Sequence, residues 1–332
     1  MNQKKRIFVS TYPFGTYNPH PIELLNQSGL EVIYNPLKRK LTSHEIFEFA
    51  RNCDGLIAGT DNLHELIKES KRLKMIARVG IGLDSVPLKL CREKGIKVSY
   101  TPDAVTLAVS ELVVGMMITL PRHVVFADRE LRLGKWSRPV GMSIRSATIG
   151  IIGLGRVGFK VGMILSAFHP AKIYVFDILE KSEEICNLRR MGLNIEQVNL
   201  QSLLEKSDII SLHVPLTQVT KNLITKSELN FMKETAYLLN FSRGGIVNEE
   251  DIYNYLKNHR IAGFAVDVYE KEPYNGKLTE LENVVLSQHM GSCSFDCRLA
   301  METQATEEMI RFFKGAPLLS EVPNFEIDAS DF

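Results

Sequence analysis

The chain alternates short runs of apolar, largely β-branched residues with longer stretches in which apolar residues recur every three to four positions. Continuous apolar runs of strand length predict strands buried on both faces, and the longer stretches predict amphipathic helices. We expect strands at residues 6–10, 30–34, 55–59, 74–79 and 96–100, and a second series at 147–153, 172–177, 208–214, 236–241, 262–268 and 283–289. Strands separated by helices in this way predict parallel sheets covered by helices on both faces.

Two such series in one chain predict two α/β domains. The join is expected within residues 101–125, which form one long helix after Thr101 and Pro102 in this interpretation. Residues 294–315 form a second long helix, ended by Gly315. A terminal helix that returns to the first domain would leave the second domain inserted in the middle of the chain.

Composition narrows the class of protein. The chain has 332 residues, 45% of them hydrophobic and 24% charged, with a formal net charge of +1. No basic surface of the kind that binds nucleic acid or an acidic membrane is expected. The N-terminus lacks a signal-peptide core, and the apolar stretch 112–120 is too short to span a bilayer. Five scattered cysteines favour reduced thiols and a cytoplasmic location.

A glycine pattern after the first strand of the second series predicts a dinucleotide site. Gly153, Gly155 and Gly158 stand in the spacing that allows a tight turn, close approach to a pyrophosphate and close packing of helix on strand. Asp177 ends the next strand, where a carboxylate accepts hydrogen bonds from ribose hydroxyls and repels a 2′-phosphate. NAD is therefore favoured over NADP, although Lys181 keeps NADP open.

Three later segments each place chemically useful side chains at the end of an expected strand. They carry Arg243, Asp267 with Glu272, and His289. Taken singly, each has an ordinary structural explanation, such as a surface ion pair or a hydrogen-bonded histidine. Together, and following a nicotinamide-binding motif in the chain, they supply what hydride transfer to a ketone needs. These are a cation to polarise the ketone, a general acid to protonate the alkoxide, and a carboxylate to orient that acid.

In this order, the segments RVGIGLDSVPL, GIIGLGRVG, HVPLT, NFSRGGIVNEEDI, AVDVYEKEP and QHMGS resemble the D-isomer-specific 2-hydroxyacid dehydrogenases over nearly the whole chain. The resemblance implies that Arg243 binds substrate, Glu272 orients the acid, and His289 is the acid/base. It also implies a substrate-binding loop and a set of cofactor contacts beyond the three glycines. The loop is Arg78, Val79, Gly80 and Ile81; the contacts are Arg156, Val157, Asp177, Val214, Pro215, Phe241, Asp267 and Thr106.

The same resemblance implies the architecture. Residues 1–105 with 292–332 would form a flavodoxin-like substrate domain, and residues 106–291 an inserted Rossmann NAD-binding domain, both doubly wound. Relatives are typically homodimers through the NAD-binding domain, and residues 122–144, which contain Trp136, are the expected dimer arm. Gln288 and Phe241 depart from the usual pattern, and Glu272 argues against the formate dehydrogenase branch, which has glutamine there.

Several substrates stay open. The resemblance favours 3-phosphoglycerate/3-phosphohydroxypyruvate, with Arg78 and the cluster Lys38, Arg39 and Lys40 as a phosphate site or, equally, the cluster as a solvated loop. Glyoxylate or hydroxypyruvate, or a specialised 2-oxo acid, is the alternative. Phosphite oxidation and a non-catalytic NAD-sensing corepressor are further alternatives.

One stretch suggests a metal site. His289, Cys293 and Cys297 follow one another at steps of four, which would stack them on one face of a continuous helix. Ser292 or Ser294 is, however, a natural N-cap, so we expect His289 to precede the helix and no metal to bind.

Overall fold

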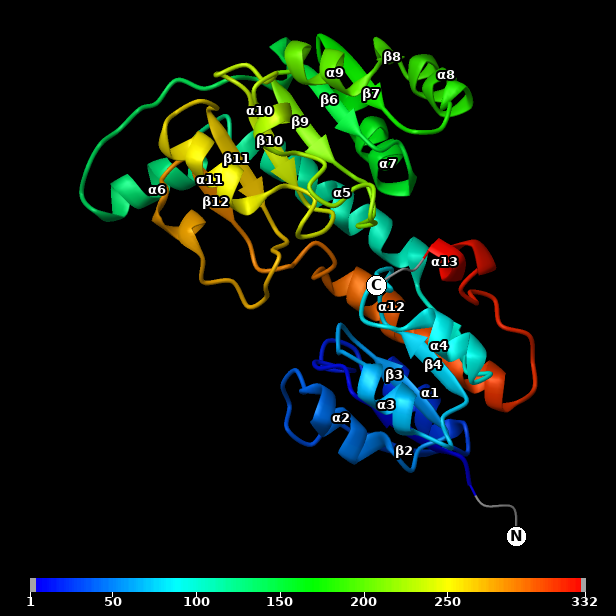
Figure 1. Ribbon diagram of the computed structural model, residues 1–332. Helices are drawn as coiled ribbons and strands as arrows, with labels where there is room; N and C mark the ends of the chain where they lie inside the picture. The colour runs from blue at the N-terminus through cyan, green and yellow to red at the C-terminus, as the bar shows by residue number, and fades with distance from the viewer. Residues whose placement is uncertain (1–3, 330–332) are drawn as a thin grey trace. The chain divides into compact units, whose positions relative to one another are not determined.

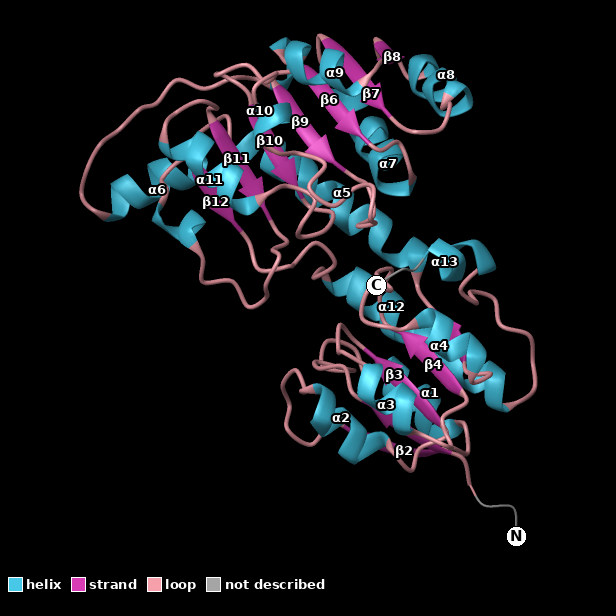
Figure 2. Ribbon diagram, in the orientation of Figure 1, coloured by secondary structure: helices cyan, strands magenta, loops and turns pink. Residues whose placement is uncertain are grey.

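The computed structural model describes residues 4–329 and shows two compact α/β units (Figure 1). One unit contains the residues up to Val105 together with those from Ser292 onward, and the other contains Thr106–Gly291. Every pair of neighbouring strands in the two sheets is parallel. The predicted fold class, two doubly wound parallel sheets with helices over their faces, is therefore confirmed (Figure 2).

The first unit has a five-stranded sheet in the order β2-β1-β3-β4-β5. Its strands are β1 (Arg6–Val9), β2 (Glu31–Tyr34), β3 (Gly55–Ala58), β4 (Met75–Arg78) and β5 (Lys97–Ser99). Its helices are α1 (His20–Gln27), α2 (Ser43–Ala50), α3 (His64–Glu69), α4 (Leu88–Glu93), α12 (Phe295–Phe313) and α13 (Asn324–Ala329). Strands β3 and β4 are buried along their whole length, as their continuous apolar sequences predict.

Helix α12 returns to the first sheet, as expected for a terminal helix. It packs against α1, β3 and β4, and it buries Cys297, Met301, Ala305 and Met309 at steps of four, one stripe of the helix surface. A Cβ on Gly55, the first residue of β3, would lie 2.6 Å from the Met309 sulfur. The end of α12 therefore lies at the amino ends of the strands, and its start lies at their carboxyl ends.

The second unit has a seven-stranded sheet in the order β12-β11-β10-β9-β6-β7-β8. Its strands are β6 (Thr148–Ile152), β7 (Lys172–Phe176), β8 (Ile195–Gln197), β9 (Ile209–Leu212), β10 (Tyr237–Asn240), β11 (Gly263–Val266) and β12 (Val284–Leu286). The helices are α5 (Pro102–Thr119), which starts in the first unit, α6 (Val124–Arg132), α7 (Arg156–Leu165), α8 (Ser182–Arg190), α9 (Leu200–Lys206), α10 (Lys226–Leu229) and α11 (Glu249–Lys257). Short 3₁₀ turns cover Ile144–Ser146, Ser166–Phe168 and Lys277–Glu280.

The structure corrects two sequence predictions. The single helix expected over residues 101–125 ends at Thr119, and α6 begins separately at Val124. Pro121 has no N–H for a helical hydrogen bond, and His123 has a left-handed φ of 54°, so the helix cannot continue through them. Strand β8 was not predicted, because its three residues include the polar Glu196 and Gln197.

Helix α5 is long and apolar enough to cross a membrane by length and composition alone. Within the second unit, however, Val113, Met117 and the following Leu120 are buried in the core that covers one face of the sheet. Its apolar character is explained by that packing.

The five cysteines fall into two chemical groups. Cys53, Cys91 and Cys297 are buried, and burial raises the pKa of their thiols to about 11, about 12 and about 11. Cys186 and Cys293 are exposed. Only the thiolate is a good nucleophile, so the two groups should differ strongly in reactivity.

Treatment of the native protein with iodoacetamide at pH 8 should modify Cys186 and Cys293 and spare the other three. A thiol with a pKa near 11 is ionised in only about one molecule in a thousand at that pH. Peptide mass spectrometry measures the modification, with urea-unfolded protein as the control in which all five react. Modification of Cys91 in the folded protein at the rate of Cys186 would contradict the buried placement.

Candidate active site

In the glycine loop after β6, two glycines have no room for a side chain and the third faces open space. Gly153 has a φ of 92°, and a Cβ there would lie 2.8 Å from the His213 carbonyl oxygen. A Cβ on Gly158 would lie 2.1 Å from the Gly153 carbonyl oxygen, so α7 can pack on the strand only if this residue is glycine. Gly155 is exposed, with no atom within 4 Å of a Cβ position. The loop is thus fixed at both ends and open in the middle, which suits a pyrophosphate at the start of α7.

Asp177 follows β7, the strand next to β6, and its side chain binds the backbone of the glycine loop. One carboxylate oxygen accepts a hydrogen bond from the Leu154 N–H at 2.8 Å, and the other accepts one from the Leu179 N–H at 2.9 Å. The predicted ribose-binding carboxylate therefore also holds the glycine loop in place.

The other predicted cofactor residues surround this loop in the second unit. Arg156 and Val157 begin α7, and Val214 and Pro215 follow β9, the neighbour of β6. Ser110 in α5 donates to the carbonyl oxygens of Thr106 and Val157, at 2.7 and 3.3 Å, which ties the Thr106 turn to the start of α7. The residues present fit an NAD molecule, because the β6–β9 boundary is where the strand order reverses and where such sheets bind dinucleotides.

His289 and Glu272 form a direct pair beyond the ends of β12 and β11. The His289 Nδ1 lies 3.0 and 2.9 Å from the two carboxylate oxygens of Glu272, and both side chains are partly exposed. The Tyr269 N–H also donates to Glu272, at 3.2 Å. With Nδ1 directed to the carboxylate, Nε2 is the ring nitrogen left to exchange a proton with a ligand. This is the orientation that a general acid/base needs.

The backbone of the His289 turn is held by Asp267, which is only 1% exposed. One Asp267 oxygen accepts from the Met290 N–H and from the Ser287 hydroxyl, and the other accepts from the Gly291 N–H. The His289 N–H donates to the Asp267 carbonyl oxygen at 2.8 Å, and His289 itself has a left-handed φ of 52°. Sequence reasoning assigned Asp267 to the nicotinamide carboxamide and missed this anchoring role, which depends on two strand ends meeting.

Arg243 lies in a loop that is fixed by its own neighbours. The Asn240 side chain donates to the Arg243 carbonyl oxygen at 2.9 Å and accepts from Ser242, and the Arg243 Nη1 donates to the Ser242 carbonyl oxygen. A Cβ on Gly244 would lie 2.0 Å from the Tyr269 carbonyl oxygen. The Arg243 loop and the loop that leads to Glu272 can therefore touch only because residue 244 is glycine. Phe241, expected at the nicotinamide, has its side chain buried in the core, which leaves its backbone for any cofactor contact.

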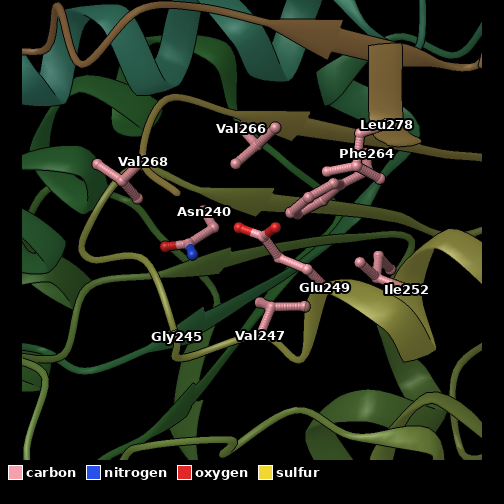
Figure 3. Close-up of a pocket in the computed structure, with 9 residues that line it drawn as sticks. All are labelled: Asn240, Gly245, Val247, Glu249, Ile252, Phe264, Val266, Val268 and Leu278. Carbon is pink, nitrogen blue, oxygen red and sulfur yellow. The ribbon is translucent and has the colours of Figure 1, made fainter. Parts of the chain in front are cut away.

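Glu249 joins the same two loops from inside the unit. It begins α11, and its carboxylate accepts a hydrogen bond from the Glu270 N–H at 2.8 Å. It lines a small cavity with Asn240 and Val268, and its carboxylate points toward Asn240 (Figure 3). Burial raises the pKa of Glu249 above its ordinary value, although the Glu270 N–H acts in the opposite direction. This acid was not singled out in the sequence, where it reads as one of three acids in the first turn of a helix.

In the first unit, the predicted substrate loop follows β4 at the carboxyl end of the sheet. Arg78 is only 6% exposed, and its guanidinium donates to the carbonyl oxygen of Val79. The Val79 N–H donates to the Ala58 carbonyl oxygen, and the Gly80 N–H donates to the Thr101 hydroxyl at 2.9 Å. These amide groups hold the loop, so a carboxylate bound here would meet the amides from Ile81 onward.

The apparent stacking of His289 with Cys293 and Cys297 does not occur. Ser294 caps α12 by accepting from the Cys297 N–H, and the helix begins at Phe295, after His289. Of the two predicted capping residues, Ser294 is the one used. Within residues 4–329, no group of three or more His, Cys, Asp or Glu side chains is placed to hold a metal ion.

A glycine-lined dinucleotide site and a histidine–carboxylate pair in one Rossmann unit define an NAD-dependent oxidoreductase acting on CH–OH groups. A model of the NAD-binding domain of the D-isomer specific 2-hydroxyacid dehydrogenases matches residues 114–291. The chain belongs to that family.

The chain is similar to curated proteins and solved structures over most of its length. It is 37% identical to a glyoxylate reductase of Thermofilum pendens, over 90% of this chain and 89% of that protein. It is 31% identical to a D-3-phosphoglycerate dehydrogenase of Archaeoglobus fulgidus, over 94% of this chain but only 58% of that longer protein. It also matches an NADPH-dependent glyoxylate/hydroxypyruvate reductase of Sinorhizobium meliloti with a TM-score of 0.82 and 26% identity, over 96% of this chain and 97% of that one.

Replacing Glu249 by alanine should lower turnover of a 2-oxo acid about tenfold, because the Glu270 N–H loses its acceptor and the Glu272 loop loses its attachment. Glu249→Gln should keep most of the activity, since an amide oxygen also accepts. The matched control is Glu250→Ala, which removes an exposed acid of the same helix turn and its ion pair with Lys277. Steady-state kinetics with NADH measure the effect. Equal activity of the Glu249 and Glu250 alanine variants would contradict a positioning role for Glu249.

Proposed function

We propose that this protein catalyses reversible hydride transfer between NAD(H) and a 2-oxo acid, with the D-2-hydroxy acid as the reduced product. The observation that carries the proposal is the His289–Glu272 pair, 2.9 Å apart at the strand ends of the NAD-binding unit. Bound NADH supplies the hydride that reaches the carbonyl carbon of the acid. The catalytic residues are His289, Glu272 and Arg243.

In the reducing direction, His289 gives a proton from Nε2 to the carbonyl oxygen as the hydride reaches the adjacent carbon. Glu272 accepts from Nδ1 and so fixes the ring for that transfer. The guanidinium of Arg243 polarises the carbonyl and binds the carboxylate of the acid. The loop of Arg78, Val79, Gly80 and Ile81 gives the carboxylate further N–H donors, mainly from Ile81 onward. The products are NAD⁺ and the hydroxy acid.

Among the possible acids, we propose an unphosphorylated one. Two of the four cations of the phosphate hypothesis are already bound within the first unit: the buried Arg78 donates to the Val79 carbonyl oxygen, and Arg39 is bound to Glu45 at 2.6 Å. That pairing holds the pKa of Glu45 at about 2, mainly through the Arg39 hydrogen bond. The Thermofilum relative of similar length, a glyoxylate reductase, supports this choice over the longer phosphoglycerate dehydrogenases. Lys38 and Lys40 are exposed, and we assign them no ligand.

We also propose a cytoplasmic homodimer that forms through the second unit. Residues 122–144 contain α6, which has no buried residue, and the exposed Leu131, Leu133 and Val140. Trp136 is 81% exposed in the same segment. Large apolar side chains gathered on one segment are typical of a protein interface. The five free thiols favour a reducing compartment.

His289→Ala should lower kcat for glyoxylate about 100- to 10,000-fold, because the general acid is lost. The dissociation constant for NADH, measured by fluorescence titration, should change less than about twofold. The matched control is His259→Asn, which alters an exposed histidine in the left-handed region at the opposite end of β11. If the wild type reduces no 2-oxo acid, or if His289→Ala retains near-normal turnover, the proposed function is wrong.

Asp177→Asn should raise the ratio of kcat/KM for NADPH to that for NADH about tenfold. The amide oxygen can still accept from the Leu154 N–H, so the loop is kept while the charge that repels a 2′-phosphate is removed. Glu180→Gln, an exposed acid three positions further, is the control. An unchanged ratio in Asp177→Asn would show that this carboxylate does not select the cofactor.

A further inference from the structure

Three aromatic side chains are exposed near the carboxyl end of the first unit's sheet. Tyr12 and Tyr17 lie in the loop after β1 and are 47% and 56% exposed. Phe295, the first residue of α12, is 74% exposed. Exposed apolar side chains that lie in a group often mark a binding surface, whereas single exposed ones are ordinary. The surface has no part in the hydride-transfer scheme described so far.

Two of these rings already contact each other. The ring centroids of Tyr17 and Phe295 lie 5.1 Å apart, with an angle of 79° between the ring planes. This edge-to-face arrangement is one that aromatic pairs favour, and it leaves parts of both rings open to a third apolar group. We call Tyr12, Tyr17 and Phe295 the aromatic platform.

The loop that carries the platform is held in one conformation by α12. The Arg298 guanidinium donates to the Pro13 carbonyl oxygen and to the Glu302 carboxylate, both at 2.5 Å. Glu302, which is buried, accepts from the Gly15 N–H at 2.7 Å. Gly15 has a φ of 63°, and Phe14 is buried, with its ring 6.3 Å from that of Tyr34. The tyrosines therefore stand on a fixed loop, as a selective binding surface requires.

The platform shares its sheet edge with the predicted carboxylate-binding loop. In the sheet order, β1 is next to β3 and β3 is next to β4, so the loop after β1 and the loop of residues 78–81 are two strands apart. Two strand spacings are about 10 Å. A Cβ on Gly59, in the loop after β3, would lie 2.9 Å from the Thr11 hydroxyl, so these loops touch. An acid held at residues 78–81 would thus lie about two strand spacings from the loop that carries the two tyrosines, a distance that a large side chain can span.

Two of the guanidinium groups near this edge are already bound within the protein, whereas Lys38 and Lys40, in the loop after β2, are exposed. Arg298 is bound to Glu302 and Pro13, and Arg78 is buried against Val79. Both guanidinium groups donate hydrogen bonds to main-chain carbonyl oxygens of the loops. A phosphate at C3 of the acid would lie against aromatic rings here and would lose hydrating water, which is unfavourable for a charged group.

We propose that the aromatic platform selects 2-oxo acids whose side chain is large and apolar, in particular aromatic. This inference rests on the proposed function and deepens it, since it names the substrate class of the same reaction. Glyoxylate has no side chain beyond its carbonyl carbon and would not reach the platform. Tyr12, Tyr17 and Phe295 are therefore specificity-determining residues, whereas His289 and Arg243 act on every 2-oxo acid.

The test compares phenylpyruvate, glyoxylate and 3-phosphohydroxypyruvate as substrates of the full-length protein with NADH. Phenylpyruvate should give the highest kcat/KM of the three. Phe295→Ala and Tyr17→Ala should each lower kcat/KM for phenylpyruvate about tenfold, mainly through KM, and change that for glyoxylate less than about twofold. Phe295→Leu, which keeps an apolar group, should lose less than Phe295→Ala.

The matched control is Phe231→Ala, which removes an exposed phenylalanine at the amino end of β10 in the other unit and should change neither substrate. A higher kcat/KM for glyoxylate or for 3-phosphohydroxypyruvate than for phenylpyruvate would overturn the inference. So would an equal loss for glyoxylate and phenylpyruvate in Phe295→Ala. Either result still shows a 2-oxo acid reductase, whereas no NADH oxidation with any acid would overturn the proposed function itself.

Discussion

The hydrogen bonds of Asp267 are the interaction on which the arrangement of the active site depends. The buried carboxylate of Asp267, just after β11, accepts hydrogen bonds from Ser287, Met290 and Gly291. The main-chain carbonyl oxygen of the same residue accepts one from the His289 N–H. A buried carboxylate without such donors would be costly, so carboxylate and turn stabilise each other. His289 is held in a left-handed conformation by these bonds, and its ring is thereby directed to Glu272.

The segments that carry the other proposed catalytic residues pack closely against the same strand end. Gly244 brings the Arg243 loop against the Tyr269 carbonyl, and Glu249 accepts from Glu270 in the same stretch. Tyr269 also donates its hydroxyl hydrogen to the Ser287 carbonyl oxygen at 2.7 Å and stacks on Tyr274 at 4.1 Å. Three segments distant in sequence are thus held by one short stretch of backbone after β11. Hydrogen bonds and close packing of this kind hold reacting groups in a fixed geometry, as catalysis requires.

The first unit carries different side chains at the carboxyl end of its sheet. Main-chain hydrogen bonds link its loops after β1, β3 and β4, and the largely buried Arg298–Glu302 pair holds the loop after β1 on α12. The exposed residues of these loops include Tyr12 and Tyr17 as well as the polar Thr16, Thr60 and Asn62.

Much of this could be predicted from the sequence because the signals are local. Apolar runs of strand length mark buried parallel strands, and the spacing of Gly153, Gly155 and Gly158 describes a turn that only glycine can form. Arg243, Glu272 and His289 follow such strands, and the carboxyl ends of parallel strands lie at one edge of a sheet. The break between α5 and α6 was missed, although Pro121 gave a local signal for it.

Other features were decided only by tertiary structure, because they join residues that are far apart in the chain. Nothing near Asp267 in sequence shows that its oxygens will face the N–H groups of residues 290 and 291. Arg78 and Arg39 look alike as candidate phosphate ligands until one is seen buried in its own loop and the other bound to Glu45. Tyr17 and Phe295, separated by most of the chain, meet only because α12 packs back on the first sheet. The sequence by itself determined the fold class and the residue types that follow the strands, whereas long-range packing decided which of these side chains are bound to one another and which are exposed.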